Sequence, residues 1–396
     1  MAEFSISNVN NLFKIKYGKL SENVYNSANV LMARQVKRYD FTGKQMFIPV
    51  PTSFTGGVGS GTLPTPNFSQ VEDANLFAKR VYARIEIDRE AMKASANDEG
   101  AFVRATKWQV QKGVESYMRN ASRILFGTGD GVLGTIDAGG VTDNGGGQYD
   151  LVISDASWNE ANFEEQDYVN IGSGSSDLLE IIEVVPATKV VRVQRITGSV
   201  VPAPADDIFM QGSENNDPQG LKGVLDFSSG SLYGVNYSRR WSAAREDVGG
   251  AGLTTDKMNE VMLEVQRRSG KVPNMIVTSF TQFRKLLNLL EDQKQYIVEP
   301  RMPELKGKIS FKGIEFMSTA GAIPVFPERF CDEDRMYFIN DNYMNCYHRP
   351  GFGWFSEDGT VLLRSANTDS YEARYGGYYE NYIVPSFLGG LVGLAV

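Results

Sequence analysis

A long ribbon between residues 41 and 84 constrains the fold of this chain more than any other feature. Between Phe77 and Ile87, apolar and polar residues alternate with the period of a half-exposed strand. The turn of the ribbon carries four glycines, namely Gly56, Gly57, Gly59 and Gly61. A two-stranded ribbon cannot bury its own faces and is marginal in water. The sequence therefore predicts either a disordered glycine-rich loop or, as we favour, an arm that a neighbouring subunit covers.

A long helix over residues 98–126 is expected after the ribbon. Asn97 and Asp98 are candidates for its N-cap, and Gly127 is expected to end it as a left-handed cap. Apolar residues recur along it at helical spacing, namely Val103, Val110, Val114, Tyr117, Ala121 and Ile124. The polar side is basic and carries Arg104, Lys107, Lys112, Arg119 and Arg123. A solvated helix face is the simplest explanation of that charge.

The remaining segments predict a chain of mixed α and β structure. Residues 21–38 have the spacing of a first helix. Residues 137–215 contain short apolar runs separated by turn residues, which predict a small all-β insertion, either a barrel or a sandwich. Two helical periods follow residues 253 and 278, and short apolar runs indicate further strands. We expect these strands at 275–277, 309–317, 323–326, 336–339, 361–364 and 371–384.

Composition narrows the classes of function. The 396 residues are 42% apolar and 22% charged, as in folded chains, and a net charge of −8 argues against a general nucleic-acid or membrane binder. His348 is the single histidine, which excludes most histidine triads and histidine metal cages. Cys331 and Cys346 suit a reducing cytosol and are expected to be small core residues. We find no signal peptide and no apolar run of spanning length, so we expect a cytoplasmic protein without a membrane partner.

No motif indicates catalysis, so we predict no catalytic, cofactor-binding or metal site and no enzyme. The glycines from Gly127 to Gly134 look like a phosphate loop, but they close a helix, whereas a dinucleotide loop opens one. A tyrosine run near the C-terminus suggests a carbohydrate-binding or carbohydrate-acting protein, because aromatic rings stack on sugars. It contains Tyr371, Tyr375, Tyr378, Tyr379 and Tyr382. Core or interface positions are the simpler interpretation of these rings.

The order of these parts resembles the major capsid proteins of tailed double-stranded DNA bacteriophages, whose Johnson fold is shared with encapsulins. Residues 321–327 and 332–341 look like the closing sheet of that family, where a chain-reversing loop feeds an edge strand that ends in Asn-Asp. The resemblance implies an α+β fold with six parts. These are an N-terminal arm (1–40), an extended β-hairpin loop (41–84), a peripheral domain with the spine helix (85–136), a β-rich insertion domain (137–215), an axial domain (216–350) and C-terminal strands that return to the peripheral and axial sheet (351–396).

The resemblance also implies a structural function. The subunit would assemble with itself into the hexamers and pentamers of an icosahedral head around double-stranded DNA, which it would touch non-specifically. It would lie in the virion capsid after assembly in the host cytoplasm, with a separate scaffolding protein, a portal and a decoration protein as partners. The extended loop would lie over a neighbour. The basic face of the spine helix would pair with acidic residues on adjacent subunits.

The resemblance leaves two questions, which are the contents of the shell and a covalent cross-link between subunits. An encapsulin-like compartment with an enzyme cargo has the same fold, although the chain length and the β-rich insertion argue against it. Some relatives join a lysine of the extended loop to an asparagine by a covalent cross-link. Lys44 and Lys79 lie in the loop region, but nothing identifies a partner or a catalytic acid, so we predict no cross-link.

Overall fold

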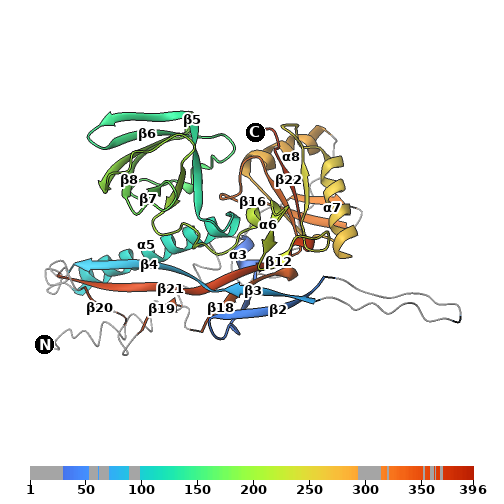
Figure 1. Ribbon diagram of the computed structural model, residues 1–396, viewed down its shortest axis with the longest axis horizontal. Coiled ribbons are helices and arrows are strands. Elements are labelled where there is room, and N and C mark those ends of the chain that lie inside the picture. Colours follow the sequence, from blue (N-terminus) through green and yellow to red (C-terminus); the bar gives the residue numbers. More distant parts are fainter. Residues whose placement is uncertain are drawn as a thin grey trace.

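The computed structural model describes residues 30–52, 61, 71–88, 99–292, 314–318, 321–350, 353–356, 361, 363–365 and 369–396. The described strands form a hairpin, two six-stranded sheets, a closed barrel and a short two-stranded pair. In Figure 1, the long strands β4 (Lys79–Asp88) and β21 (Ser370–Ile383) lie below helix α5 (Glu99–Phe126). The barrel and the second sheet lie side by side above them. We call the sheet of β4 and β21, together with α5, the base.

The base sheet is organised around β21. This strand pairs antiparallel with β4 over ten positions, from Ser370 opposite Asp88 to Tyr379 opposite Lys79. The other base strands are β1 (Val36–Arg38), β18 (Met344–His348), β19 (Gly353–Trp354) and β20 (Leu363–Arg364). β18, β19 and β20 each pair antiparallel with β21, and β1 adds to β18 in parallel. β21 is therefore the strand through which the base sheet holds together.

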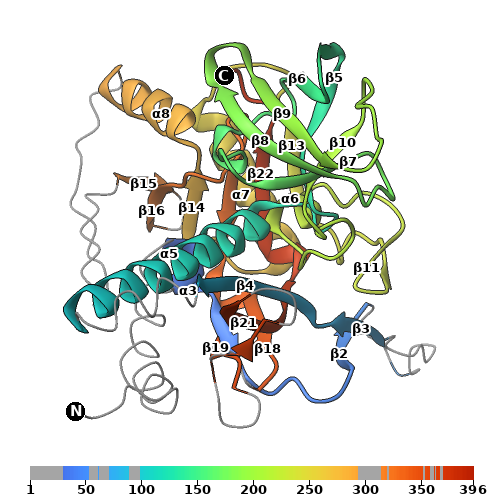
Figure 2. The ribbon, with the colours of Figure 1, turned by 90° about the vertical axis from the view of Figure 1, so that its left-hand side faces the viewer.

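Helix α5 crosses the base sheet and packs its apolar side on it (Figure 2). The predicted range of 98–126 is confirmed to within one residue, and at about 1.5 Å per residue its 28 residues make about 42 Å. The described residues of the predicted apolar stripe are buried, namely Val110, Val114, Tyr117, Ala121 and Ile124. Tyr117 meets Tyr375 of β21 edge to face, with ring centroids 5.2 Å apart.

The end of α5 differs from the prediction. The Gly127 N–H donates to the Ile124 carbonyl oxygen at 3.0 Å, which tightens the last turn. The first glycine with positive φ after the helix is Gly129, at 91°, so the left-handed cap at Gly127 is wrong. This hydrogen bond supplies a partner for a carbonyl group at the end of the helix, so the helix ends without a residue in the left-handed conformation.

The ribbon is shorter than the sequence predicts. β2 (Gln45–Pro51) and β3 (Val71–Phe77) form the hairpin, with Gln45 opposite Phe77 and Pro51 opposite Val71. The prediction that the strand from Phe77 to Ile87 is the return arm of the ribbon is wrong, because β4 (Lys79–Asp88) pairs with β21 instead. Alternation identified β4 as a strand, but the period of a strand does not specify its partner.

The first predicted helix is also shorter than expected. α3 spans Val30–Arg34, and residues 36–38 of the predicted 21–38 helix form strand β1 instead. Residues 21–29 lie outside the described chain. The pairing of β1 with β18 explains the difference, because tertiary hydrogen bonding overrides a weak local preference.

The β-rich insertion is a closed six-stranded barrel in the order β10-β5-β6-β9-β8-β7. Its strands are β5 (Val132–Gly145), β6 (Gln148–Ile153), β7 (Tyr168–Ile171), β8 (Leu178–Val185), β9 (Val190–Thr197) and β10 (Asp207–Met210). The barrel alternative is therefore confirmed over the sandwich. Inward-facing residues such as Leu151, Val169 and Leu179 are fully buried in a core of their own.

The second six-stranded sheet has the order β13-β22-β17-β14-β16-β15. Its strands are β13 (Ala244–Asp247), β14 (Met275–Thr278), β15 (Ile314–Ser318), β16 (Gly321–Pro327), β17 (Met336–Ile339) and β22 (Leu388–Val392). Helices α7 (Thr255–Ser269) and α8 (Phe280–Asp292) pack against it and share its core. The strand at 336–339 is confirmed, whereas β18 and β22 were not predicted. β18 belongs to the base sheet although the expected axial range of 216–350 includes it.

A narrow neck joins the barrel to the base. The Asn215 N–H donates to the Asp130 carbonyl oxygen at 2.7 Å, which ties the exit chain to the entry chain. Gly131 has a φ of 88°, and a Cβ there would lie 2.3 Å from the Ser213 carbonyl oxygen. Only glycine combines this backbone conformation with so close an approach.

The close contact in the neck predicts that alanine substitutions at two glycines differ in their effect on stability. Gly131→Ala should lower the free energy of unfolding by more than Gly212→Ala, measured by denaturant titration. Gly212 also has positive φ, but a Cβ there meets nothing within 4 Å. Its alanine variant therefore carries only the left-handed strain of about 1–2 kcal/mol. Equal losses in the two variants would contradict the close contact at Gly131.

Candidate assembly surfaces

The β2–β3 hairpin has one covered face and one apolar exposed face. Residues directly opposite in an antiparallel pair share a face. Ala74 and Leu76 point to the covered face and are fully buried. On the other face, Phe47, Val71 and Phe77 are 58%, 57% and 44% exposed. We call this second face the hairpin outer face.

The position of the hairpin is set by the chain itself. The Asn75 N–H of β3 donates to the Tyr233 carbonyl oxygen at 2.7 Å. The Asn236 N–H donates to Glu72 Oε2 at 3.2 Å, from the short pair β11 (Ser231–Leu232) and β12 (Val235–Asn236). These bonds fix the direction in which the hairpin leaves the body.

The four glycines of the predicted flexible tip fall mostly outside the described chain. Gly56, Gly57 and Gly59 are not described. Gly61 is exposed, has a φ of 91°, and would have no atom within 4 Å of an added Cβ. The tip therefore stays a prediction.

The basic side of α5 is largely used inside the chain. Arg123 is 6% exposed and pairs with Asp217 at 2.9 Å. Arg119 forms ion pairs with Glu164 and Asp167 of the barrel. The expectation that these arginines pair with adjacent subunits, and the simpler expectation of a solvated face, are both wrong for them. Burial at the base of the barrel explains why their partners lie in the same chain.

The other three basic residues of that side are less informative. Lys112 is exposed and pairs with Glu115 at 2.7 Å, one turn along the same helix. The side chains of Arg104 and Lys107 lie outside the described part of the chain. A contact of these three residues with another subunit therefore stays a prediction.

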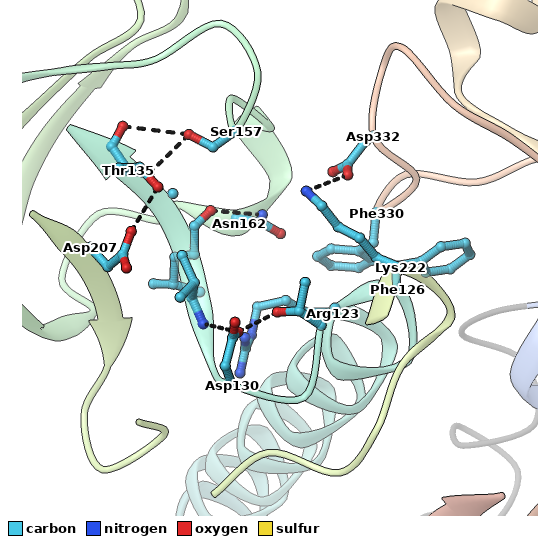
Figure 3. Close-up of a pocket in the computed structure, with 15 residues that line it drawn as sticks. Arg123, Phe126, Asp130, Thr135, Ser157, Asn162, Asp207, Lys222, Phe330 and Asp332 are labelled. Carbon is cyan, nitrogen blue, oxygen red and sulfur yellow. Dashed lines mark hydrogen bonds and ion pairs between the residues drawn. The ribbon is translucent and has the colours of Figure 1, made fainter. Parts of the chain in front are cut away.

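The glycines after α5 border a cavity of about 250 Å³ between the barrel and the base (Figure 3). Two cations line it, and both have carboxylate partners: Arg123 pairs with Asp217, and Lys222 Nζ lies 2.8 Å from Asp332. Thr135 donates to Asp207 at 2.7 Å on the barrel side. The glycines follow a helix, as predicted, and do not open one. The arrangement thus offers a phosphate no unpaired lining cation.

Cys346 and His348 form a buried pair that the sequence analysis missed. Both cysteines are buried, as predicted, and Cys346 Sγ lies 3.2 Å from His348 Nε2. Burial raises the pKa of the Cys346 thiol and lowers the pKa of His348 to about 4. At neutral pH the pair is therefore a thiol beside a neutral imidazole, not the thiolate–imidazolium pair of a nucleophile. The sequence did contain a signal for this pair, because residues two apart on one strand lie on the same face of the sheet.

The tyrosine run belongs to the core. Tyr375, Tyr379 and Tyr382 are 1%, 4% and 6% exposed, so they cannot offer a stacking platform to a sugar. The core interpretation is confirmed for these three rings.

Among the described residues, no group of three or more potential ligands could hold a metal ion, and no helix is long and apolar enough to cross a membrane.

Glu380 of β21 is a buried carboxyl group that joins the base to the chain leaving the barrel. The N–H groups of Gln219 and Asn381 donate to its Oε1 at 2.7 and 3.2 Å. Burial raises its pKa from 4.5 to about 8, although these N–H groups and Lys79 oppose the shift. The group is thus held protonated at neutral pH. Nothing in the sequence pattern distinguished it from an exposed glutamate.

The raised pKa of Glu380 predicts a pH dependence of stability. The folded chain binds this proton up to about pH 8, whereas the unfolded carboxyl releases it near 4.5. Stability should therefore fall as pH rises through this window, by up to about 1.4 kcal/mol per pH unit. Glu380→Gln lacks this group, so the wild-type free energy of unfolding minus that of E380Q should fall between pH 5 and 8. Denaturant unfolding at a series of pH values measures it, and a constant difference would contradict the assignment.

Comparison with solved structures shows the fold. The chain is similar to the capsid subunit of cyanophage A-1(L), with a TM-score of 0.56, 11% identity and 93% coverage of both chains. It is also similar to the SrpI encapsulin of Synechococcus elongatus PCC 7942 (TM-score 0.49, 7% identity, 92% and 87% coverage) and to the satellite phage P4 procapsid (TM-score 0.42, 10% identity, 100% and 98% coverage). The first likeness shows that the α+β chain has the Johnson fold of tailed-phage capsid subunits.

Comparison with family models narrows the class further. The model that matches is described as SU10 major capsid protein and covers residues 205–352, which include β10, β18 and every strand of the second sheet except β22. No curated protein sequence matches the chain. This match covers 148 of the 396 residues, and together with the fold it supports a structural major capsid protein of the tailed-phage class.

Proposed function

We propose that the chain assembles with itself into the hexamers and pentamers of an icosahedral phage head that encloses double-stranded DNA. The hairpin outer face carries this proposal. Phe47, Val71 and Phe77 are exposed on a ribbon whose base is fixed by hydrogen bonds to the body. An uncovered apolar ribbon is an aggregation hazard unless a neighbour is its intended cover. Ring-closing head-to-tail contacts of one such ribbon generate rings of five and six.

The finer assignments belong to the same proposal. We assign the six parts from the N-terminal arm to the C-terminal strands, with β4 and β18 moved to the base sheet. We also assign a role without catalysis, assembly in the host cytoplasm and non-specific contacts with DNA. A separate scaffolding protein, a portal and a decoration protein complete the set of partners. We also propose that no covalent cross-link forms. Lys79 Nζ supports this, because it donates to the Asn215 carbonyl oxygen of its own chain at 2.8 Å.

The first measurement is the particle mass of the purified protein, by light scattering with negative-stain microscopy. Shells or capsomers are the expected result. The contents then separate the two capsid-like alternatives, because a phage head holds DNA and an encapsulin-like compartment holds a protein cargo. A stable monomer, even with a candidate scaffolding protein present, would overturn the proposal.

Substitutions on two equally exposed phenylalanines test the hairpin outer face. Phe47→Ser should raise the protein concentration needed for assembly about tenfold or more, because a buried phenylalanine contributes about 1.5–3 kcal/mol. Phe280→Ser is the matched control, since Phe280 of α8 is 59% exposed against 58% for Phe47. Light scattering across a concentration series gives both thresholds. Equal thresholds for F47S and the wild type would exclude Phe47 from the contact.

Deletion of residues 52–66 tests the tip of the extended loop. We expect the shortened subunit to fold, because the hydrogen bonds of the hairpin base lie outside the deletion. Shell assembly should be lost or misdirected. Circular dichroism checks the fold and microscopy the assembly, and normal particles would remove the tip from the proposed contact.

A further inference from the structure

The barrel is packed on the base less closely than either part is packed within itself. Its apolar core is separate from that of the base, and Ala161 is its one described residue in the base core. The cavity of about 250 Å³ in Figure 3 lies between the two parts. A larger cavity of about 590 Å³ separates the barrel loop at 164–167 from α5 and from residues 328–330. Close packing resists motion, so such gaps mark the place where the two parts can move.

The neck holds one side of the barrel firmly. The Asn215 N–H bonds the Asp130 carbonyl oxygen, and Gly131 lies against Ser213. Gln219 Nε2 also donates to the Thr128 carbonyl oxygen at 2.9 Å. These bonds join the entry and exit chains to each other, so they act as one pivot.

A single arginine holds the other side. Arg119 reaches from α5 at the larger cavity to Glu164 and Asp167, which lie between β6 and β7. In the part of the chain that the structure describes, no other ion pair links the barrel strands and loops at 132–210 to the base. The Glu164 side chain is 57% exposed and the Asp167 side chain 26% exposed. The Arg119 side chain is 15% exposed, but water reaches both of its carboxylate partners, so a contact of ordinary size can compete for them.

We infer that the barrel is a hinged body that turns about the neck, and that Arg119 is the positioning residue that latches it against α5. When the latch opens, Glu164 and Asp167 move into solvent, where water replaces the arginine. The hinge gives one chain two barrel orientations. Its use, to fit the different neighbours of pentamers and hexamers, rests on the proposed function, whereas the hinge itself is a property of the single subunit.

Distance measurement in the full chain tests the hinge. Spin labels on Thr188→Cys of the barrel and Gln266→Cys of α7 report the orientation of the barrel, and both positions are exposed. The native Cys331 and Cys346 are buried and do not compete for the label. Labelled chain is diluted with unlabelled chain, so that distances between subunits do not contribute. We expect one narrow distance distribution in the otherwise wild-type chain.

Breaking the latch should broaden or split this distribution. Arg119→Ala breaks it from the helix side, and the double variant E164Q/D167N breaks it from the barrel loop. Lys112→Ala is the matched control, because Lys112 lies on the same helix and pairs only with Glu115 in the described chain. Reversing the charges in R119E/E164R/D167R should restore the narrow distribution. A structural role of Arg119 in folding alone would not produce this restoration.

The outcomes separate the hinge from the proposed function. If R119A does not fold, E164Q/D167N decides the question, because its substitutions are in a partly exposed loop. A folded latch variant with the narrow wild-type distribution overturns the hinge, even if the protein forms shells. A broadened distribution in a latch variant supports the hinge whether or not that variant forms shells, whereas the proposed function is overturned only if the wild-type chain forms none.

Discussion

The structure depends on the pairing of β21 with β4. Ten successive residue pairs anchor β21 on β4, and α5 packs across the sheet through the contact of Tyr117 with Tyr375. A few residues later the same chain enters the second sheet as β22, between β13 and β17. One continuous segment thus ties the base to the second sheet. The neck is tied to it as well, because Glu380 of β21 accepts the Gln219 N–H.

Much of the fold was predictable because period and turn chemistry are local properties. The helix Glu99–Phe126 and the all-β insertion follow from patterns within single segments. Partners are not local. The period of β4 fitted a hairpin arm as well as it fitted a base strand, and only tertiary pairing decided between them. β22 was missed because its glycine-rich apolar sequence has no alternation, as is usual for a strand buried on both faces.

The same difference between local patterns and distant partners applies to the candidate sites. The ribbon and the basic side of α5 were visible in the sequence because each follows a local pattern, whereas the exposed apolar face of the hairpin was found only in the structure. The partners of Arg119 and Arg123 were not, since Glu164, Asp167 and Asp217 come from the barrel and the neck. The raised pKa of Glu380 was equally hidden. It arises from burial under a segment more than a hundred residues away in the chain, which no local pattern encodes.

The geometry of the neck allows the barrel to be replaced by another domain. The chain enters it at Gly131 and leaves it at Ser213, and these two points are in contact. The barrel is closed, so it has no strand edge to share with the rest of the subunit. Any compact domain whose own ends lie as close together meets the same requirement. The barrel can therefore be exchanged for another domain by grafting at two residues that are in contact, while the rest of the subunit keeps its sequence.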